Sequence, residues 1–215
     1  MNKELSVGSV FTKAWGSFKA AQKSLGTVWL VVIAINFILG LLNSREHKAS
    51  LAGLLIFVFS IISMYVLTRL SIKAVRGESF VAKDEMLNID WMKALMLLVL
   101  SVIFGLSIGL GMVLLVVPGI IIAIRFMLSS YVFIDENLGL VESAKRSLEL
   151  TRGHGWDLFL VGLVLFISSI LASIITLGLA SFIFMPAQIL IGAVIYERLR
   201  NVSLPKVEGP SVSAK

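Results

Sequence analysis

Charged residues are absent from several runs of this chain that are each long enough to cross a lipid bilayer. The longest are residues 94–134, in which Arg125 is the only charged residue, and residues 158–196, which carry no charge. Residues 24–44 and 49–68 are also uncharged. A transmembrane helix needs about 20 apolar residues, so each longer run can hold two spans and each shorter run one. The pattern therefore predicts an all-α, polytopic membrane protein with six transmembrane helices.

The composition agrees with a membrane protein and not with a soluble domain. Charged residues make up 15% of the chain, whereas soluble domains carry about 25%. The runs are too long and too uniformly apolar for barrel strands. We expect the spans at residues 25–43, 51–71, 92–110, 112–133, 157–176 and 179–197. They would form a single transmembrane domain over residues 1–200, followed by a disordered cytoplasmic tail over residues 201–215.

Lysine and arginine are distributed unequally between the two sides that six spans would define. The side that holds both termini would carry Lys3, Lys13, Lys19, Lys23, Arg69, Lys73, Arg76, Lys83, Lys145, Arg146, Arg152, Arg198, Arg200, Lys206 and Lys215. The other side would carry only Arg45 and Lys48, and Lys93 and Arg125 are assigned to neither side. Basic residues gather on the cytoplasmic side, so both termini are predicted to be cytoplasmic. The net charge of +6 then indicates contact with anionic phospholipid headgroups and no nucleic-acid partner.

Amphipathic segments precede the first, third and fifth expected spans. In the first, residues 8–23, the apolar side chains of Val10, Ala14 and Phe18 fall on one helical face. Residues 79–90 and 138–152 show the same pattern, so all three segments are predicted to be in-plane helices at the cytoplasmic surface. The three units repeat with a period of about 65 residues. Duplication and a shared structural constraint both explain this period.

A proline occurs within each of the last two expected hairpins. Pro118 and Gly119 form a pair in the fourth span, and Pro186 lies in the sixth. In a membrane bundle a proline kinks a helix at low cost, because neighbouring groups can satisfy the freed carbonyl. The alternative is a hinge for a gating motion. Gly105 and Gly109 add a GxxxG spacing, which allows close helix packing.

Arg125 is the only charged residue deep inside an expected span. One interpretation is structural: the side chain extends toward the cytoplasmic headgroups or pairs with Asp135, Glu136, Glu197 or Asp157. The other is that Arg125 lines a cytoplasm-facing cavity and contacts an anion such as a lipid phosphate. Asn36 and Gln188 are the other candidate polar partners within the spans, because amides can form hydrogen bonds between helices.

The sequence shows no arrangement of residues that is typical of an enzyme. There is no cysteine, and the two histidines, His47 and His154, would lie on opposite sides of the membrane. Asp135 and Glu136 are adjacent on a helix, so their side chains diverge and suit a charged helix end better than acid–base chemistry. We therefore expect no enzymatic activity, no metal and no cofactor.

The stretch from Gly109 to Phe159 carries a combination of motifs that resembles a known family. The motifs are Pro118-Gly119, Asp135-Glu136, the helix segment from Ser143 to Leu148, and Gly153 with Trp156. This stretch is similar to uncharacterised bacterial six-span proteins related to the glycerophosphoryl diester phosphodiesterase membrane-domain family. The resemblance implies a bacterial inner-membrane protein. It implies no phosphodiesterase activity, since in fused members that activity belongs to a separate soluble domain.

Two functions follow as hypotheses. The first is a non-enzymatic accessory or partner-binding module in membrane or envelope homeostasis, which binds a protein partner or forms a homo-oligomer within the lipid bilayer. The second is a transporter or lipid-handling protein with a cytoplasm-facing cavity at Arg125.

Overall fold

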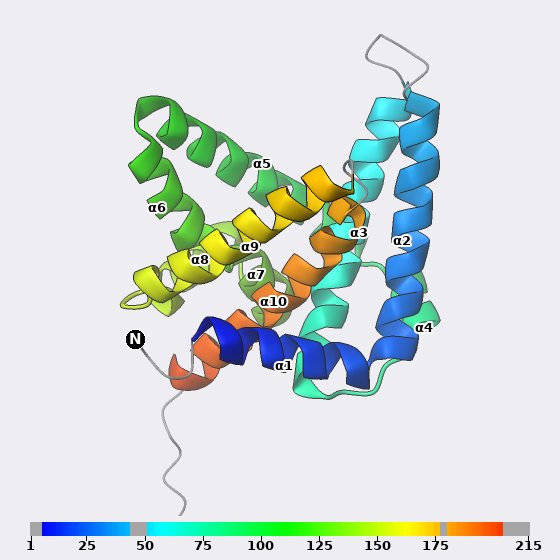
Figure 1. Ribbon diagram of the computed structural model, residues 1–215, viewed down its shortest axis with the longest axis horizontal. Helices are drawn as coiled ribbons and strands as arrows, with labels where there is room; N and C mark the ends of the chain where they lie inside the picture. The colour runs from blue at the N-terminus through cyan, green and yellow to red at the C-terminus, as the bar shows by residue number, and fades with distance from the viewer. Residues whose placement is uncertain (1–5, 44–50, 177–179, 204–215) are drawn as a thin grey trace, which may run out of the picture.

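The computed structural model describes residues 6–43, 51–176 and 180–203, and every regular element within these ranges is an α-helix (Figure 1). The helices are α1 (Val7–Ala20), α2 (Gln22–Asn43), α3 (Leu51–Arg76), α4 (Ala82–Leu87), α5 (Trp91–Leu114), α6 (Val116–Phe126), α7 (Ser129–Glu136), α8 (Leu140–Leu150), α9 (Gly155–Ile175) and α10 (Ala180–Ser203). The predicted all-α class is confirmed. Residues 201–203 complete α10, and the rest of the expected tail, together with His47, lies outside the described residues.

Four helical stretches are long and apolar enough to cross a membrane. They are Leu55–Arg76, Trp91–Leu114, Val116–Glu136 and Gly155–Ile175. The bent pair formed by α1 and α2 supplies a fifth if it is taken as one span. The protein is therefore a polytopic membrane protein, as predicted, with four to five of the six expected spans found among the described residues. α10 is not one of them.

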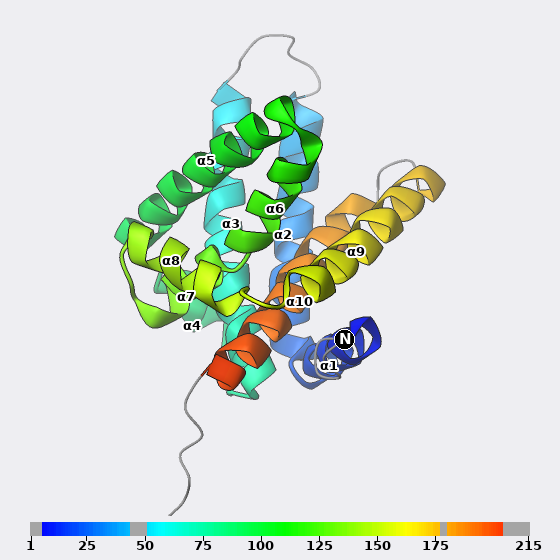
Figure 2. The same cartoon turned by 90° about the vertical axis from the view of Figure 1, so that its left-hand side faces the viewer.

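The chain repeats one order of elements three times: a short helix and then a helical hairpin. The short helices α1, α4 and α8 coincide with the three segments expected at the membrane surface. The axes of α1 and α2 meet at 95°, so α1 lies along the membrane surface if α2 crosses it. α1, α4 and α8 lie toward the same end of the molecule as the C-terminal end of α10, whereas the α5–α6 turn lies at the opposite end (Figures 1 and 2).

The core lies where α3, α7 and α10 pack together. Leu70 of α3, Val132 of α7, and Val194 and Ile195 of α10 are fully buried. α5 and α9 contribute little to this core. Only 17% of the apolar stretch of α5 and 11% of the apolar stretch of α9 are buried within the chain. These two helices therefore present most of their apolar surface to lipid or to another protein.

Candidate functional site

A cluster of ionised side chains joins the ends of four helices. Arg76, in the last turn of α3, donates hydrogen bonds to Asp135 Oδ2 of α7 and to Glu197 Oε1 of α10, both over 2.6 Å. Arg200 lies one turn beyond Glu197, and its guanidinium is 3.3 Å from Asp135 Oδ2 and 3.8 Å from Glu197 Oε1. The two carboxylates thus share two arginines.

Glu136 extends the same cluster to α8. Its carboxylate lies 3.6 Å from Nε of Arg146, on α8, and 3.8 Å from Nε of Arg200. The hydroxyl of Tyr196, a fully buried side chain, is 2.7 Å from Asp135 Oδ2 and 3.1 Å from Glu136 Oε1. We define the charged cluster as Arg76, Asp135, Glu136, Arg146, Tyr196, Glu197 and Arg200.

The balance of charge in the charged cluster suits a structural role. Three guanidinium groups face three carboxylates, so each acidic side chain has a cationic partner. Partly buried carboxylates are costly unless they are paired in this way. Among the residues that the structure describes, no group of three or more His, Cys, Asp and Glu side chains is placed to hold a metal ion. The cluster fixes the ends of α3, α7, α8 and α10 relative to one another.

Arg125 lies in the last turn of α6, half-buried and outside the charged cluster. Asp135, Glu136 and Glu197, three of its expected partners, contact other arginines instead. No ion pair of Arg125 is present within the described part of the chain. Its backbone carbonyl, however, accepts a hydrogen bond from the hydroxyl of Ser147 over 2.8 Å.

That hydrogen bond shows how α8 caps the end of α6. The last carbonyls of a helix have no partner within it, and α6 ends at Phe126. Ser147 and Thr151, both fully buried, point their hydroxyls at the Arg125 carbonyl over 2.8 Å and 3.5 Å. The amphipathic pattern of residues 138–152 places Val141 and Leu148 on an apolar face, yet they are 60% and 38% exposed. The packed face of α8 is lined by small hydroxyl side chains.

The amides expected to join spans lie in other surroundings. The side chain of Asn36 donates to the Val32 carbonyl of its own helix over 2.8 Å. Gln188 is exposed on α10. Pro186 is a buried residue inside α10, which continues as a helix on both sides of it.

The Pro118-Gly119 pair lies in the first turn of α6, close to the turn that joins α5 to α6. The direction of the chain changes at Leu115, whose backbone is extended, and Pro118 follows in the first turn of α6. A proline there removes no helical hydrogen bond, because the first N–H groups of a helix have no partner. A Cβ added to Gly111 would be 2.9 Å from the Cα of Gly119. The two glycines therefore allow α5 and α6 to meet closely at the turn.

The GxxxG pair on α5 makes no such contact. A Cβ added to Gly105 or to Gly109 would meet nothing within 4 Å, and both residues are exposed. The close packing expected from this spacing is thus not found within the described part of the chain.

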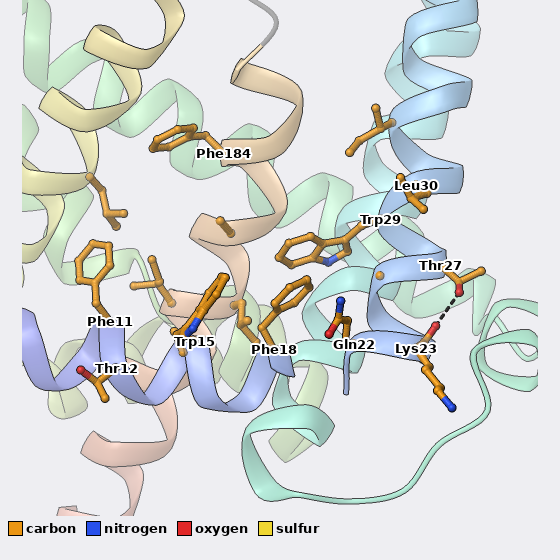
Figure 3. A pocket seen from close by; sticks show the side chains of 17 residues that line it. Phe11, Thr12, Trp15, Phe18, Gln22, Lys23, Thr27, Trp29, Leu30 and Phe184 are labelled. Carbon is orange, nitrogen blue, oxygen red and sulfur yellow. Dashed lines mark hydrogen bonds between the residues drawn. The ribbon is translucent and has the colours of Figure 1, made fainter. Parts of the chain in front are cut away.

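A large pocket lies inside the corner formed by α1 and α2, and α9 and α10 complete its wall (Figure 3). Its volume is about 1250 Å³. Aromatic side chains from α1, namely Phe11, Trp15 and Phe18, point toward Trp29 of α2 and Phe184 of α10 (Figure 3). Arg125 is not among the lining residues. The amphipathic pattern of residues 8–23 predicted an apolar face on α1 that includes Phe18, but it could not show that this face lines a pocket.

The fold and the charged cluster define a polytopic α-helical membrane protein whose polar helix ends are locked together by ion pairs. The chain belongs to the family described as "protein of unknown function (DUF975)", whose family model matches residues 50–203. No curated protein and no solved structure matches the chain. A relationship to the glycerophosphoryl diester phosphodiesterase membrane-domain family is not shown by these comparisons.

Proposed function

We propose that this protein is a non-catalytic accessory module that binds another membrane-embedded helix through α5. It would act in membrane or envelope homeostasis in the bacterial inner membrane, with both termini in the cytoplasm. The observation that carries the proposal is the exposed glycine pair on α5, Gly105 and Gly109. Only 17% of the apolar stretch of this helix is buried within the chain. The unequal distribution of lysine and arginine supports the orientation.

The glycine pair favours a helical partner over lipid alone. A glycine inside a helix costs about 1 kcal/mol relative to alanine. Gly111, further along α5, has an evident use in its contact with Gly119, whereas Gly105 and Gly109 have no neighbour that requires a small residue. Small residues spaced four apart let a second transmembrane helix approach closely. A helix from a partner or from a second copy fits this surface.

The alternative, a transporter or lipid-handling protein with a cavity at Arg125, has less support. The residues that line the large pocket do not include Arg125, and they come from α1, α2, α9 and α10 instead of α6.

The test is native mass spectrometry of the protein extracted gently from its own membrane. We expect a defined complex, with a second polypeptide or a second copy, that is lost in the double variant Gly105→Leu/Gly109→Leu. Gly162→Leu is the matched control, because Gly162 is also an exposed glycine of a long apolar helix with nothing within 4 Å of an added Cβ. A wild-type protein that is always monomeric, or a complex that survives the double variant, would refute the proposal.

The absence of cysteine allows an independent measurement in the membrane. A single cysteine at Leu106, an exposed residue beside Gly105, is the only thiol in the chain and can cross-link only to another molecule. A disulfide-linked dimer would identify a second copy as the partner, and a mixed disulfide with another polypeptide would identify a different one.

A further inference from the structure

The pocket at the corner of α1 and α2 has a charged rim and an apolar interior. Lys23 lies at the corner, and its ammonium points away from the aromatic side chains that fill the interior (Figure 3). Lys19 precedes it on α1 and lies 5.4 Å from the ring centre of Trp15, which lines the pocket. An amphipathic ligand with a polar end near the two lysines fits this arrangement.

The charge at the rim selects the polar end of the ligand. Residues 6–38 contain Lys13, Lys19 and Lys23 and no acidic residue. None of the three lysines forms an ion pair with any other described residue. These lysines therefore have no acidic partner among the described residues, and an anionic ligand could provide one. A membrane surface offers such ligands in its anionic phospholipid headgroups.

Trp29 contributes an aromatic ring to the wall of the pocket. Its indole ring lines the pocket and stacks on Phe18 with the ring centres 4.9 Å apart. An apolar acyl chain can pack against this aromatic surface. Trp29 lies six residues beyond Lys23 on α2, about 9 Å along the helix, and so deeper in the membrane.

We propose that this pocket holds one anionic phospholipid. Its phosphate lies against Lys19 and Lys23, and an acyl chain fills the interior between α1, α2, α9 and α10 and packs against Trp29. The volume of about 1250 Å³ exceeds the range of about 300–1,000 Å³ that is usual for small-molecule sites, as a long flexible chain requires. A second copy of this chain is a poorer occupant, because its net charge of +6 would not neutralise the lysines. This site is separate from the α5 surface of the proposed function.

Fluorescence quenching of Trp29 tests the proposal. In the variant Trp15→Phe/Trp91→Phe/Trp156→Phe, Trp29 is the only tryptophan. The protein is reconstituted in phosphatidylcholine vesicles with rising fractions of phosphatidylglycerol or phosphatidylcholine whose acyl chains are brominated. We expect brominated phosphatidylglycerol to quench Trp29 at a lower fraction than brominated phosphatidylcholine. Equal quenching curves would overturn the proposal.

Two further variants separate the site from general attraction to the membrane surface. Lys19→Gln/Lys23→Gln should lower the preference for phosphatidylglycerol by about fivefold for each lysine removed. Lys145→Gln/Arg152→Gln, which removes two exposed cations from the α8 region, should leave it unchanged. Equal losses in both double variants would show a non-specific surface effect and refute the site.

A third variant tests the acyl-chain position. Gly26 lines the pocket, and a Cβ there would meet nothing within 4 Å, so Gly26→Leu fills the space without a collision. This variant should abolish the preference for phosphatidylglycerol, while Gly162→Leu should preserve it. An unchanged preference in Gly26→Leu would place the lipid elsewhere and contradict the proposal.

Discussion

The side chain of Tyr131, on α7, lies directly over Gly192 of α10. Its hydroxyl donates to the carbonyl of Ile189 over 2.9 Å, and its ring stacks near Tyr196 with the ring centres 6.1 Å apart. A Cβ on Gly192 would lie 2.7 Å from Cζ of Tyr131 and would collide with the hydroxyl. Gly192 thus permits the approach of α7 to α10 that brings Asp135 to Arg200.

Replacement of Gly192 by alanine should destabilise the protein by about 1–3 kcal/mol, because the collision involves a side chain that is buried on all sides. The measurement is the free energy of unfolding in detergent micelles, from a denaturant titration followed by circular dichroism. Gly162→Ala, on the exposed face of α9, is the control and should be neutral or slightly stabilising. In a Tyr131→Val background the Gly192→Ala change should cost much less, since the collision is gone. Equal costs in both backgrounds would contradict the contact.

Ser147→Ala tests the cap that α8 provides for α6. The substitution removes the closer of two hydroxyl donors to the Arg125 carbonyl, and Thr151 remains 3.5 Å away, so we expect a loss of about 1 kcal/mol in the free energy of unfolding. Ser107→Ala is the matched control, because that exposed hydroxyl bonds only to the Ile103 carbonyl of its own helix. The same unfolding titration measures both variants. If the two serines prove equally dispensable, the cap contributes nothing to stability.

The membrane class and the short helices before each hairpin could be predicted from the sequence, because both depend on local patterns. Apolar runs about 20 residues long fix where helices can span, and amphipathic spacing fixes where surface helices form. Both patterns appear in the structure, in α5 and α1 among others.

The contacts between elements could not be predicted in the same way. The partner of Asp135 depends on how α3, α7 and α10 are rotated about their axes, and hydropathy does not define that rotation. Arg76 reaches Asp135 from a residue 59 positions away, whereas Arg125, much nearer in sequence, does not. The turn between α5 and α6 illustrates the same limit, since we expected it near residue 111 and the chain turns at Leu115.

Gly119→Ala should disturb the turn between α5 and α6. An added Cβ would lie 2.8 Å from the backbone nitrogen of Met112, and backbone cannot move aside as a flexible side chain can. We expect a loss of about 1–3 kcal/mol in the free energy of unfolding. Gly105→Ala, on the open face of the same hairpin, should be neutral or stabilising. A stable Gly119→Ala variant would mean that the hairpin is more open than the structure shows.

Arg76→Gln should be the most disruptive single change in the charged cluster. It leaves Asp135 and Glu197 close together, each with a side chain only 11% exposed, and only Arg200 near both. Removal of one partner from a fully buried ion pair costs about 3–5 kcal/mol, and partial exposure with a remaining arginine lowers our expectation to about 2 kcal/mol. Arg152→Gln is the control: this exposed arginine forms no ion pair within the described residues, and its loss should change stability by less than about 0.5 kcal/mol.

A double variant distinguishes loss of the ion pairs from a general packing defect in Arg76→Gln. Arg76→Gln/Asp135→Asn should regain part of the lost stability, because it removes one of the two carboxylates left without Arg76. The same unfolding titration measures this recovery. No recovery in the double variant would show that Arg76 acts through its aliphatic packing and not through its charge.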